Sequence, residues 1–278
     1  INMCLNYCLI YGHFGAPELG IVGAAIATLV SRAVELVIIL VYVVFIDRKL
    51  RMKLREILHF DFTYLRDYIR ISSPVIISGL LWGVAQAAQT AVLGHISANV
   101  IAANSIAVTF GQIFAVFGMS CANTSSVMTG KTIGEGRLDV IRAYAKTLQG
   151  IFICFGIVFG GLLFVSRYAI VDIYSISEET RRLTLSFLTV LSITTVGSCY
   201  QYPISGGIIS GGGMTEYTAI VDNLFMWLFV IPFSALSAFV FNFPPVITFM
   251  FLKADQILKC IPNSIVCNRF RWVKQLTR

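Results

Sequence analysis

Residues 71–130 read ISSPVIISGLLWGVAQAAQTAVLGHISANVIAANSIAVTFGQIFAVFGMSCANTSSVMTG. This stretch contains no Asp, Glu, Lys or Arg, and His95 is the one side chain in it that could carry a charge. Charged residues make up about a quarter of an ordinary soluble protein, and about 20 apolar residues cross the hydrocarbon core of a bilayer. A short segment of small and polar residues, 93–99, divides the stretch. It therefore predicts two transmembrane helices, 71–93 and 100–128, joined by a tight turn.

The composition of the whole chain agrees with a protein whose main partner is the lipid bilayer. Hydrophobic residues make up 57% of the 278 residues and charged residues 13%. A soluble protein of this length would need a polar surface that such a composition does not supply. The net charge of +7 could indicate nucleic acid. The basic residues, however, cluster at the ends of apolar segments, so we expect no nucleic-acid partner.

The basic residues fall into three groups that separate the apolar segments. Seven Lys and Arg lie in 48–70, four in 131–146 and six in 253–278. If the segments between these groups cross the membrane in pairs, all three groups lie on one side, which the positive-inside rule makes the cytoplasm. The sequence therefore predicts a multi-pass protein of the cell (inner or plasma) membrane with a cytoplasmic C-terminus.

The apolar segments predict an all-α fold, a polytopic transmembrane helix bundle. Strands of alternating polarity, which would indicate a membrane barrel, are not seen. The chain opens within a helix and without an initiator Met, so we expect upstream helices to be missing. The expected elements are a helix end at 1–11 and seven spans at 20–46, 71–93, 100–128, 144–165, 183–209, 217–238 and 243–258, the last of which begins at Pro244-Pro245.

Three of these spans carry uncharged polar residues at helical spacing. If the three polar stripes face one another, they line a wet central cavity. If they face neighbouring helices, they are hydrogen-bonding contacts of about 0.6 kcal/mol each. The presence of three stripes favours the cavity. The candidate residues of a substrate or cation cavity are Gln86, Gln89, Asn104, Thr109, Gln112, Asn123, Ser198, Gln201 and Asp222.

Two charged features lie inside expected spans, where a charge is costly and indicates function unless it is neutralised. Arg32 and Glu35 stand three residues apart and can form a structural ion pair on one helix face. We expect Asp222 to be the one acid well inside a span of the second half. It either binds a proton or cation, or hydrogen-bonds a neighbouring helix near the cytoplasmic interface.

Motifs of enzymes and metal sites are absent from the sequence. There is no G-x-S-x-G, no H-E-x-x-H and no P-loop, and the three His are scattered. The seven Cys show no C-x-x-C pair and no zinc spacing. We therefore predict a protein that is not an enzyme, with no catalytic residue, no metal and no cofactor. The pairs Gly79/Gly83 and Gly156/Gly160 allow helices to approach closely and predict a packed bundle.

Six short segments together are typical of one family of membrane proteins. In chain order they are LNYCLIYGHFGAPELGIVGAAIAT (5–28), LGHI (93–96), AANSI (102–106), GKTIGEG (130–136), GGIISGGG (206–213) and FRWVKQLTR (270–278). They resemble the multidrug and toxic compound extrusion (MATE) family, bacterial type, and the first of them resembles the junction of helices five and six of that family. The resemblance implies four segments. Residues 1–46 are the end of an N-terminal lobe (the stub of helix five, and helix six), and 47–70 are a cytoplasmic link. Residues 71–258 are a MATE-like C-terminal six-helix lobe, and 259–278 are a basic cytoplasmic tail.

The resemblance also implies a secondary active transporter, a monomer when full length, that works by alternating access between two lobes. Such transporters export small amphipathic or cationic compounds in exchange for Na+ or H+, and the N-terminal lobe would be a missing partner. Because one lobe lacks its partner surface, we expect this chain alone to transport nothing. Related flippases of lipid-linked saccharides share the fold, and a non-transporting membrane scaffold or remnant is the other alternative. Gly79 stands where some relatives carry an acid, and residues 210–215 lack a charged pair found in others, so the coupling ion is not indicated.

Overall fold

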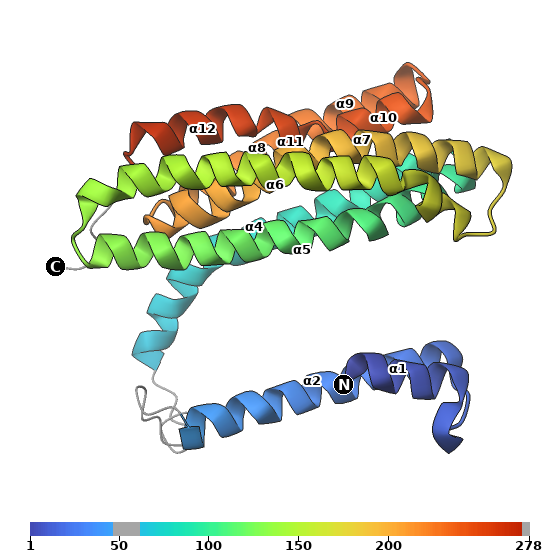
Figure 1. Ribbon diagram of the computed structural model, residues 1–278, viewed down its shortest axis with the longest axis horizontal. Helices are drawn as coiled ribbons and strands as arrows, with labels where there is room; N and C mark the ends of the chain where they lie inside the picture. Colours follow the sequence, from blue (N-terminus) through green and yellow to red (C-terminus); the bar gives the residue numbers. More distant parts are fainter. Residues whose placement is uncertain (47–61, 274–278) are drawn as a thin grey trace. The chain divides into compact units, whose positions relative to one another are not determined.

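The computed structural model describes residues 1–46 and 62–273, and it divides the chain into two units, 1–71 and 72–278. All regular elements in these described ranges are helices (Figure 1), which confirms the all-α prediction. Part of the expected link, residues 47–61, and the end of the expected tail, residues 274–278, lie outside the described residues.

The first unit contains two packed helices. Helix α1 (Asn2–Tyr11) ends at Gly12, which has the left-handed conformation (φ 69°) that glycine adopts most readily. A short 3₁₀ turn, η1 (His13–Gly15), leads to α2 (Gly20–Val41), which continues as the π-helical turn η2 (Tyr42–Ile46). A Cβ atom on Gly23 would collide with the backbone carbonyl of Leu9, so glycine allows α1 and α2 to approach closely. These elements agree with the expected helix end and first span.

The charge-free stretch forms a helical hairpin, which lies in the second unit except for the start of its first helix, residues 62–71. Helix α4 (Phe62–Ile96) and helix α5 (Ala98–Gly134) are separated by the extended residue Ser97. The Oγ of Ser97 accepts a hydrogen bond from the backbone N–H of Val100 at 3.3 Å and caps α5. Both helices extend beyond the bounds that we expected. Since α4 begins at Phe62, the last part of the link expected at 47–70 is helical.

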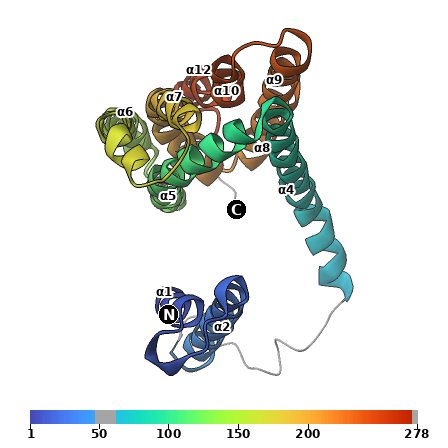
Figure 2. The ribbon, with the colours of Figure 1, turned by 90° about the vertical axis from the view of Figure 1, so that its right-hand side faces the viewer.

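Helix α7 (Glu178–Tyr202) lies at the centre of the second unit. It contacts α5, α6 (Leu138–Asp172) and the C-terminal helices, as Figure 2 shows. It continues as the π-helical segment η3 (Pro203–Ile209), where Pro203 has no N–H to donate to the carbonyl four residues earlier.

The glycine pairs differ in their packing. A Cβ on Gly156 or Gly160 of α6 would meet the backbone of α7 at Val196 or Ser192 within 3 Å, so this pair brings two helices together as predicted. A Cβ on Gly79 or Gly83 of α4, in contrast, would meet no atom within 4 Å. Only the α6 pair therefore acts as a packing motif within this unit.

The next helix alternates between α and π segments: α8 (Thr215–Phe225), η4 (Met226–Val230), α9 (Ile231–Ala235) and η5 (Leu236–Val240). Pro232 interrupts the regular hydrogen-bond ladder near the end of η4. Side chains of α4 contact this helix at separate points. The Nδ2 of Asn223 donates to Ser78 at 2.7 Å, and the rings of His95 and Phe239 lie 4.4 Å apart.

The last helical stretch consists of α10 (Pro245–Lys253), α11 (Asp255–Leu258) and α12 (Cys260–Arg269). It begins at Pro245, as expected, but it extends past residue 258 into the segment that we expected to be a tail. Pro262 cannot donate to the carbonyl of Leu258, which accounts for the interruption at Lys259. Beyond α12, Trp272 is fully buried and donates its Nε1–H to the carbonyl of Cys267 at 2.8 Å.

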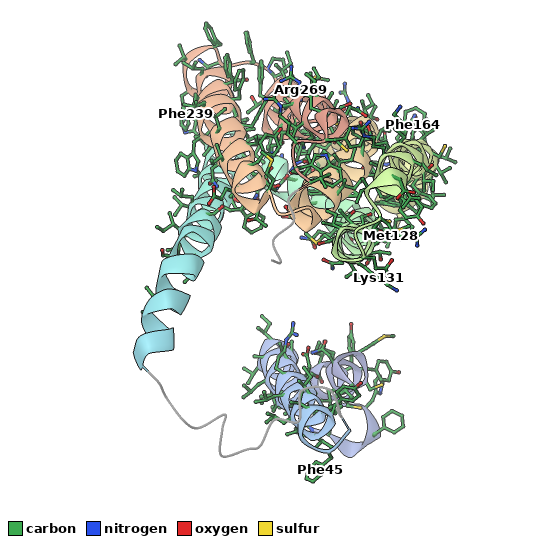
Figure 3. All side chains as sticks on the ribbon, turned by 90° about the vertical axis from the view of Figure 1, so that its left-hand side faces the viewer. Phe45, Met128, Lys131, Phe164, Phe239 and Arg269 are labelled. Atoms are coloured by element: carbon green, nitrogen blue, oxygen red, sulfur yellow. The ribbon has the colours of Figure 1, made fainter. Side chains whose placement is uncertain are left out.

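Six helices among the described residues are long and apolar enough to cross a membrane, whereas we expected seven spans. The segment 243–258 is not among them, because it is divided into short helices and carries Lys253 and Asp255. Large apolar side chains point outward from these helices, including Phe164 and Phe239 in Figure 3. Exposed apolar surface on this scale indicates contact with lipid. The six spans are Gly20–Val41, Ile76–Ile96, Ala98–Gly134, Asp139–Asp172, Glu178–Ile209 and Thr215–Val240.

Candidate functional site

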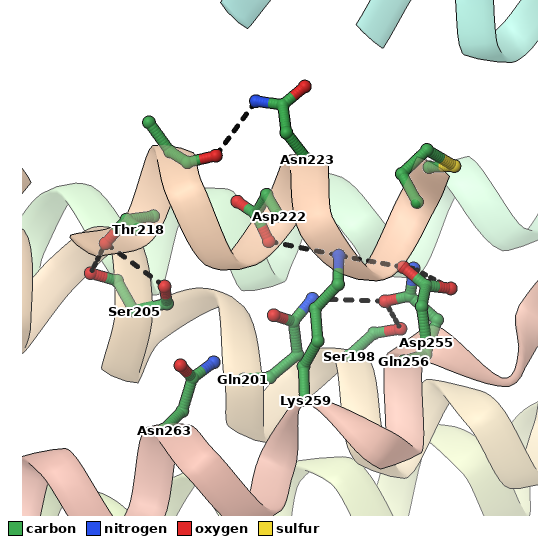
Figure 4. A network of polar contacts seen from close by, with 12 residues as sticks. Ser198, Gln201, Ser205, Thr218, Asp222, Asn223, Asp255, Gln256, Lys259 and Asn263 are labelled. Atoms are coloured by element: carbon green, nitrogen blue, oxygen red, sulfur yellow. Dashed lines mark hydrogen bonds and ion pairs between the residues drawn. The ribbon is translucent and has the colours of Figure 1, made fainter. Parts of the chain in front are cut away.

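A charged cluster lies inside the second unit, centred on Lys259. Its Nζ is 2.9 Å from Oδ2 of Asp255, one helical turn earlier, and 3.0 Å from Oδ1 of Asp222 on α8 (Figure 4). Lys259 and Asp255 are 4% and 2% exposed, whereas the Asp222 side chain is 44% exposed. With one cation and two carboxylates, the cluster has a formal charge of −1.

A glutamine connects the cluster to α7. The Nε2 of Gln256 donates to both carboxylate oxygens of Asp255 at 3.2 and 3.3 Å. The Oε1 of Gln256 accepts from Ser198 Oγ at 2.9 Å and from Gln201 Nε2 at 3.1 Å. These contacts, drawn in Figure 4, form one continuous polar network from α7 to α8. We call these six residues (Ser198, Gln201, Asp222, Asp255, Gln256 and Lys259) the charged network.

Local sequence explains how the charged network is held. Asp255 and Lys259 are four residues apart, which places them on the same face of a helix. A Cβ on Gly197 would collide with the backbone carbonyl of Gln256, so only glycine allows the last helical stretch to come this close to α7. This close approach brings the amide of Gln256 within hydrogen-bonding distance of Ser198.

Each end of the charged network lines a cavity. Ser198 and Gln256 line a cavity of about 140 Å³ between α5, α7 and the α10–α11 junction, which we call the lysine cavity because Lys253 also lines it. Asp222 lines a cavity of about 520 Å³ between α4 and α8, together with residues such as Trp82 and Thr218. A chain of hydrogen bonds and ion pairs thus runs from one cavity to the other.

Three of the residues that the sequence analysis selected come together in the charged network: Ser198, Gln201 and Asp222. Gln89 lies near this group but outside it. Its side chain is 8% exposed, and its Nε2 contacts the sulfur of Met226 at 3.1 Å. Gln86 is half-buried on α4 and is not part of the network.

The candidates on α5 do not join them. Gln112 is exposed and lines the lysine cavity opposite Ser198. Thr109 is exposed and donates to the backbone carbonyl of Ser105 in its own helix at 2.7 Å. Asn123 is exposed, and Asn104 is half-buried. The polar stripe of α7 is therefore buried inside the unit, whereas the stripe of α5 faces outward, and the two meet only at the lysine cavity.

Asp222 was expected to be the one acid well inside a span of the second half, and it does lie in one of the six spans, but it is not the most deeply buried acid. Asp255 is more deeply buried, and both acids pair with Lys259, which we assigned to the tail. Sequence reasoning missed Asp255, Gln256 and Lys259. The signal for them was an acid and a lysine at helical spacing directly after an apolar helix.

Arg32 and Glu35 of α2 form an ion pair of 2.8 Å, with 76% and 53% of the two side chains exposed. This pair lies in the first unit, outside the charged network. Among the described residues, no group of three His, Cys, Asp or Glu side chains is placed to hold a metal ion.

Comparison with known proteins identifies the family to which the chain belongs. Residues 74–236, more than half of the chain, match the family described as MatE. The "Probable multidrug resistance protein NorM" of Listeria monocytogenes is 26% identical over 235 residues, which cover 83% of this chain and 51% of that protein. The protein of the same name from Bacillus cereus is 24% identical over 242 residues, covering 86% and 52%. The chain thus spans about half the length of the curated relatives it matches.

Solved structures agree with this assignment. One described as the outward-facing conformation of a multidrug resistance MATE family transporter aligns with a TM-score of 0.78 at 20% identity, covering 98% of this chain and 59% of that one. An inward-facing conformation of a transporter described in the same words aligns with a TM-score of 0.75 at 19% identity, covering 98% and 61%. The structures show the shared fold, and the match over residues 74–236 shows that the chain belongs to the MatE family, the multidrug and toxic compound extrusion family that its sequence resembles.

Proposed function

We propose that this chain forms the C-terminal lobe, and the end of the N-terminal lobe, of a secondary active transporter that exports amphipathic or cationic compounds in exchange for Na+ or H+. The transporter works by alternating access in the cell membrane, with a cytoplasmic C-terminus. Relatives bear the name of a multidrug resistance protein. Related structures are described as outward-facing and inward-facing. Two such conformations are what alternating access requires.

The charged network is the observation that carries this proposal. A charged group inside the membrane is costly and indicates an ion pathway by default. The formal charge of −1 leaves one carboxylate for which Lys259 does not compensate, and Asp222 is the more exposed of the two. A proton or a monovalent cation at Asp222 would neutralise the cluster. We therefore assign the coupling role to Asp222.

The energy available to such an ion is sufficient for export. Moving one elementary charge across 100 mV supplies about 2.3 kcal/mol. A tenfold concentration ratio corresponds to about 1.4 kcal/mol, so one coupled cation can sustain a roughly 40-fold gradient of an uncharged substrate. For a monovalent cationic substrate, a one-for-one exchange moves no net charge, and the concentration gradient of the coupled ion supplies the energy. Binding at Asp222 from one side and release to the other would couple this energy to the movement of substrate.

The test is efflux from membrane vesicles that contain the product of the complete reading frame of this chain. Vesicles are loaded with a fluorescent amphipathic cation, and an inward Na+ or pH gradient is imposed. We expect Asp222→Asn to reduce gradient-driven efflux at least about tenfold while the amount of protein in the membrane is unchanged. Glu216→Gln is the matched control, because Glu216 is an exposed acid in the first turn of the same helix. Equal efflux from the Asp222→Asn variant and the native protein would refute the coupling role, and no gradient-driven efflux from the native protein would refute the transporter.

A further inference from the structure

The lysine cavity contains a single charged side chain. Among the residues that line it, Lys253 is the one ionisable group with a formal charge at neutral pH. The other lining residues include apolar side chains of α5 and α7, such as Phe114 and Leu191, and six uncharged polar residues, among them Gln112 and Ser198. A cavity that combines apolar walls with polar groups is typical of a binding site for a small organic molecule.

Lys253 has no carboxylate partner in the part of the chain that the structure describes. Its ammonium nitrogen lies 5.8 Å from the centre of the Phe249 ring, which is a weak interaction for a cation. The acid nearest in sequence, Asp255, is already paired with Lys259 at 2.9 Å and bonded to Gln256. Lys253 therefore lines the cavity without an ion-pair partner among the described residues, although the charge of Asp255 acts on it from a longer distance.

An unpaired ammonium is stabilised by an incoming anion through a charge-assisted hydrogen bond, which is stronger than one between neutral groups. The size of the cavity limits what can enter. A cavity of about 150 Å³ accommodates a benzene ring, and the lysine cavity measures about 140 Å³. This volume is sufficient for about one aromatic ring.

We infer that the lysine cavity is a binding site for amphipathic organic anions, with Lys253 as the residue that binds the carboxylate or a similar acidic group. This inference rests on the proposed function, because it names the class of compound that this lobe would bind during transport. The family resemblance implied amphipathic or cationic compounds, and this cavity favours amphipathic compounds of negative charge. Gln112 and Ser198, on opposite walls, supply further hydrogen-bonding groups at the cavity.

The test is equilibrium dialysis of two radiolabelled ligands with the same ring and tail, 4-butylbenzoate and 4-butylbenzylammonium. The 278-residue chain is held in nanodiscs of phosphatidylcholine, which carries no net charge, and binding to empty nanodiscs is subtracted. We expect the benzoate to bind at least about tenfold more tightly than the ammonium compound, as one charge-assisted hydrogen bond predicts. Lys253→Gln should abolish this preference and Lys253→Arg should retain it.

Lys146→Gln is the matched control, because it removes an exposed lysine of α6 that does not line the cavity. If Lys253→Gln fails to fold, Gln112→Glu tests the inference in its place, since it puts a carboxylate at an exposed position of the cavity wall. We expect that variant to weaken benzoate binding by about tenfold or more. Equal binding of the two ligands, preference for the ammonium compound, or no binding of either would overturn the inference. This experiment measures binding, whereas the test of the proposed function measures gradient-driven efflux. Either result can be negative while the other is positive, so the two failures are distinguishable.

Discussion

Removal of the Lys259 charge is the most direct test of how the charged network is built. In Lys259→Met, the carboxylate of Asp255, whose side chain is 3% exposed, loses the cation 2.9 Å away. Removing one partner of a buried ion pair costs about 3–5 kcal/mol, because the other charge remains buried without compensation. We therefore expect the free energy of unfolding of Lys259→Met to fall by about this amount.

The structure also predicts which substitutions cost less. Asp222→Asn should cost only about 1 kcal/mol or less, because that side chain is 44% exposed and Lys259 retains Asp255. The double variant Asp255→Leu/Lys259→Met replaces the pair with apolar side chains, which is often close to neutral. In the double variant the side-chain amide of Gln256 also loses its hydrogen-bond acceptor, which lowers the free energy of unfolding by about 1 kcal/mol. The double variant should therefore be more stable than Lys259→Met alone.

The assay is unfolding in mixed micelles, followed by the loss of helical circular dichroism as the mole fraction of sodium dodecyl sulfate increases. A double-mutant cycle over Asp255 and Lys259 gives the interaction energy of the pair. We expect the two single substitutions to cost much more in sum than the double substitution. If the costs are additive, or if Lys259→Met costs less than about 1 kcal/mol, the two charges are not paired in an apolar environment and the reasoning is wrong.

Three further predictions use the same chain. Gly160→Ala should lower the free energy of unfolding by about 1–3 kcal/mol, because the added methyl group meets the backbone of α7. Gly161→Ala is the control and should leave the free energy of unfolding unchanged, because its methyl group meets no atom within 4 Å. An equal decrease in both variants would contradict the close packing of α6 on α7. In a cysteine-free background, a membrane-impermeant maleimide should label Gln112→Cys in the folded protein. It should label Gln201→Cys only after denaturation, because Gln201 is 1% exposed. Labelling of both variants in the folded protein would contradict the burial of the polar face of α7. Trp272→Ala should speed proteolysis of the C-terminal segment, measured by mass spectrometry, because the fully buried indole holds that segment in place; an unchanged cleavage rate would show that it does not.

The membrane hairpin and most of the helices could be predicted from sequence because exclusion of charge is a local property. A run without Asp, Glu, Lys or Arg over 71–130 is visible without any knowledge of neighbours, and α4 and α5 lie where it predicts. The last helix was harder for the same reason. We ended the last span at residue 258 and assigned Lys259 to the tail, because a sequence pattern counts charges whether or not they are paired.

The pairing itself could not be predicted. Asp222 and Lys259 are far apart in the chain, and their 3.0 Å contact depends on how α8 and the last helical stretch pack. Helical spacing identified a polar face on α7 but not what that face contacts. Gly197, which decides this contact by allowing Gln256 to approach, carries no signal of its own within a helix that contains many small residues.

The polar residues of α5 differ in whether they need a hydrogen-bonding partner outside the helix. Its hydroxyl groups are satisfied within the helix: Ser105, Thr109 and Ser120 each donate to the carbonyl four residues earlier, at 2.7 to 3.0 Å. A hydroxyl bonded in this way can face lipid or protein at little cost. The amides of Gln112 and Asn123 have no such bond within the described residues. An amide without a partner is costly in an apolar environment, so these two positions, and not the stripe as a whole, mark where α5 must meet water, a ligand or another polar surface.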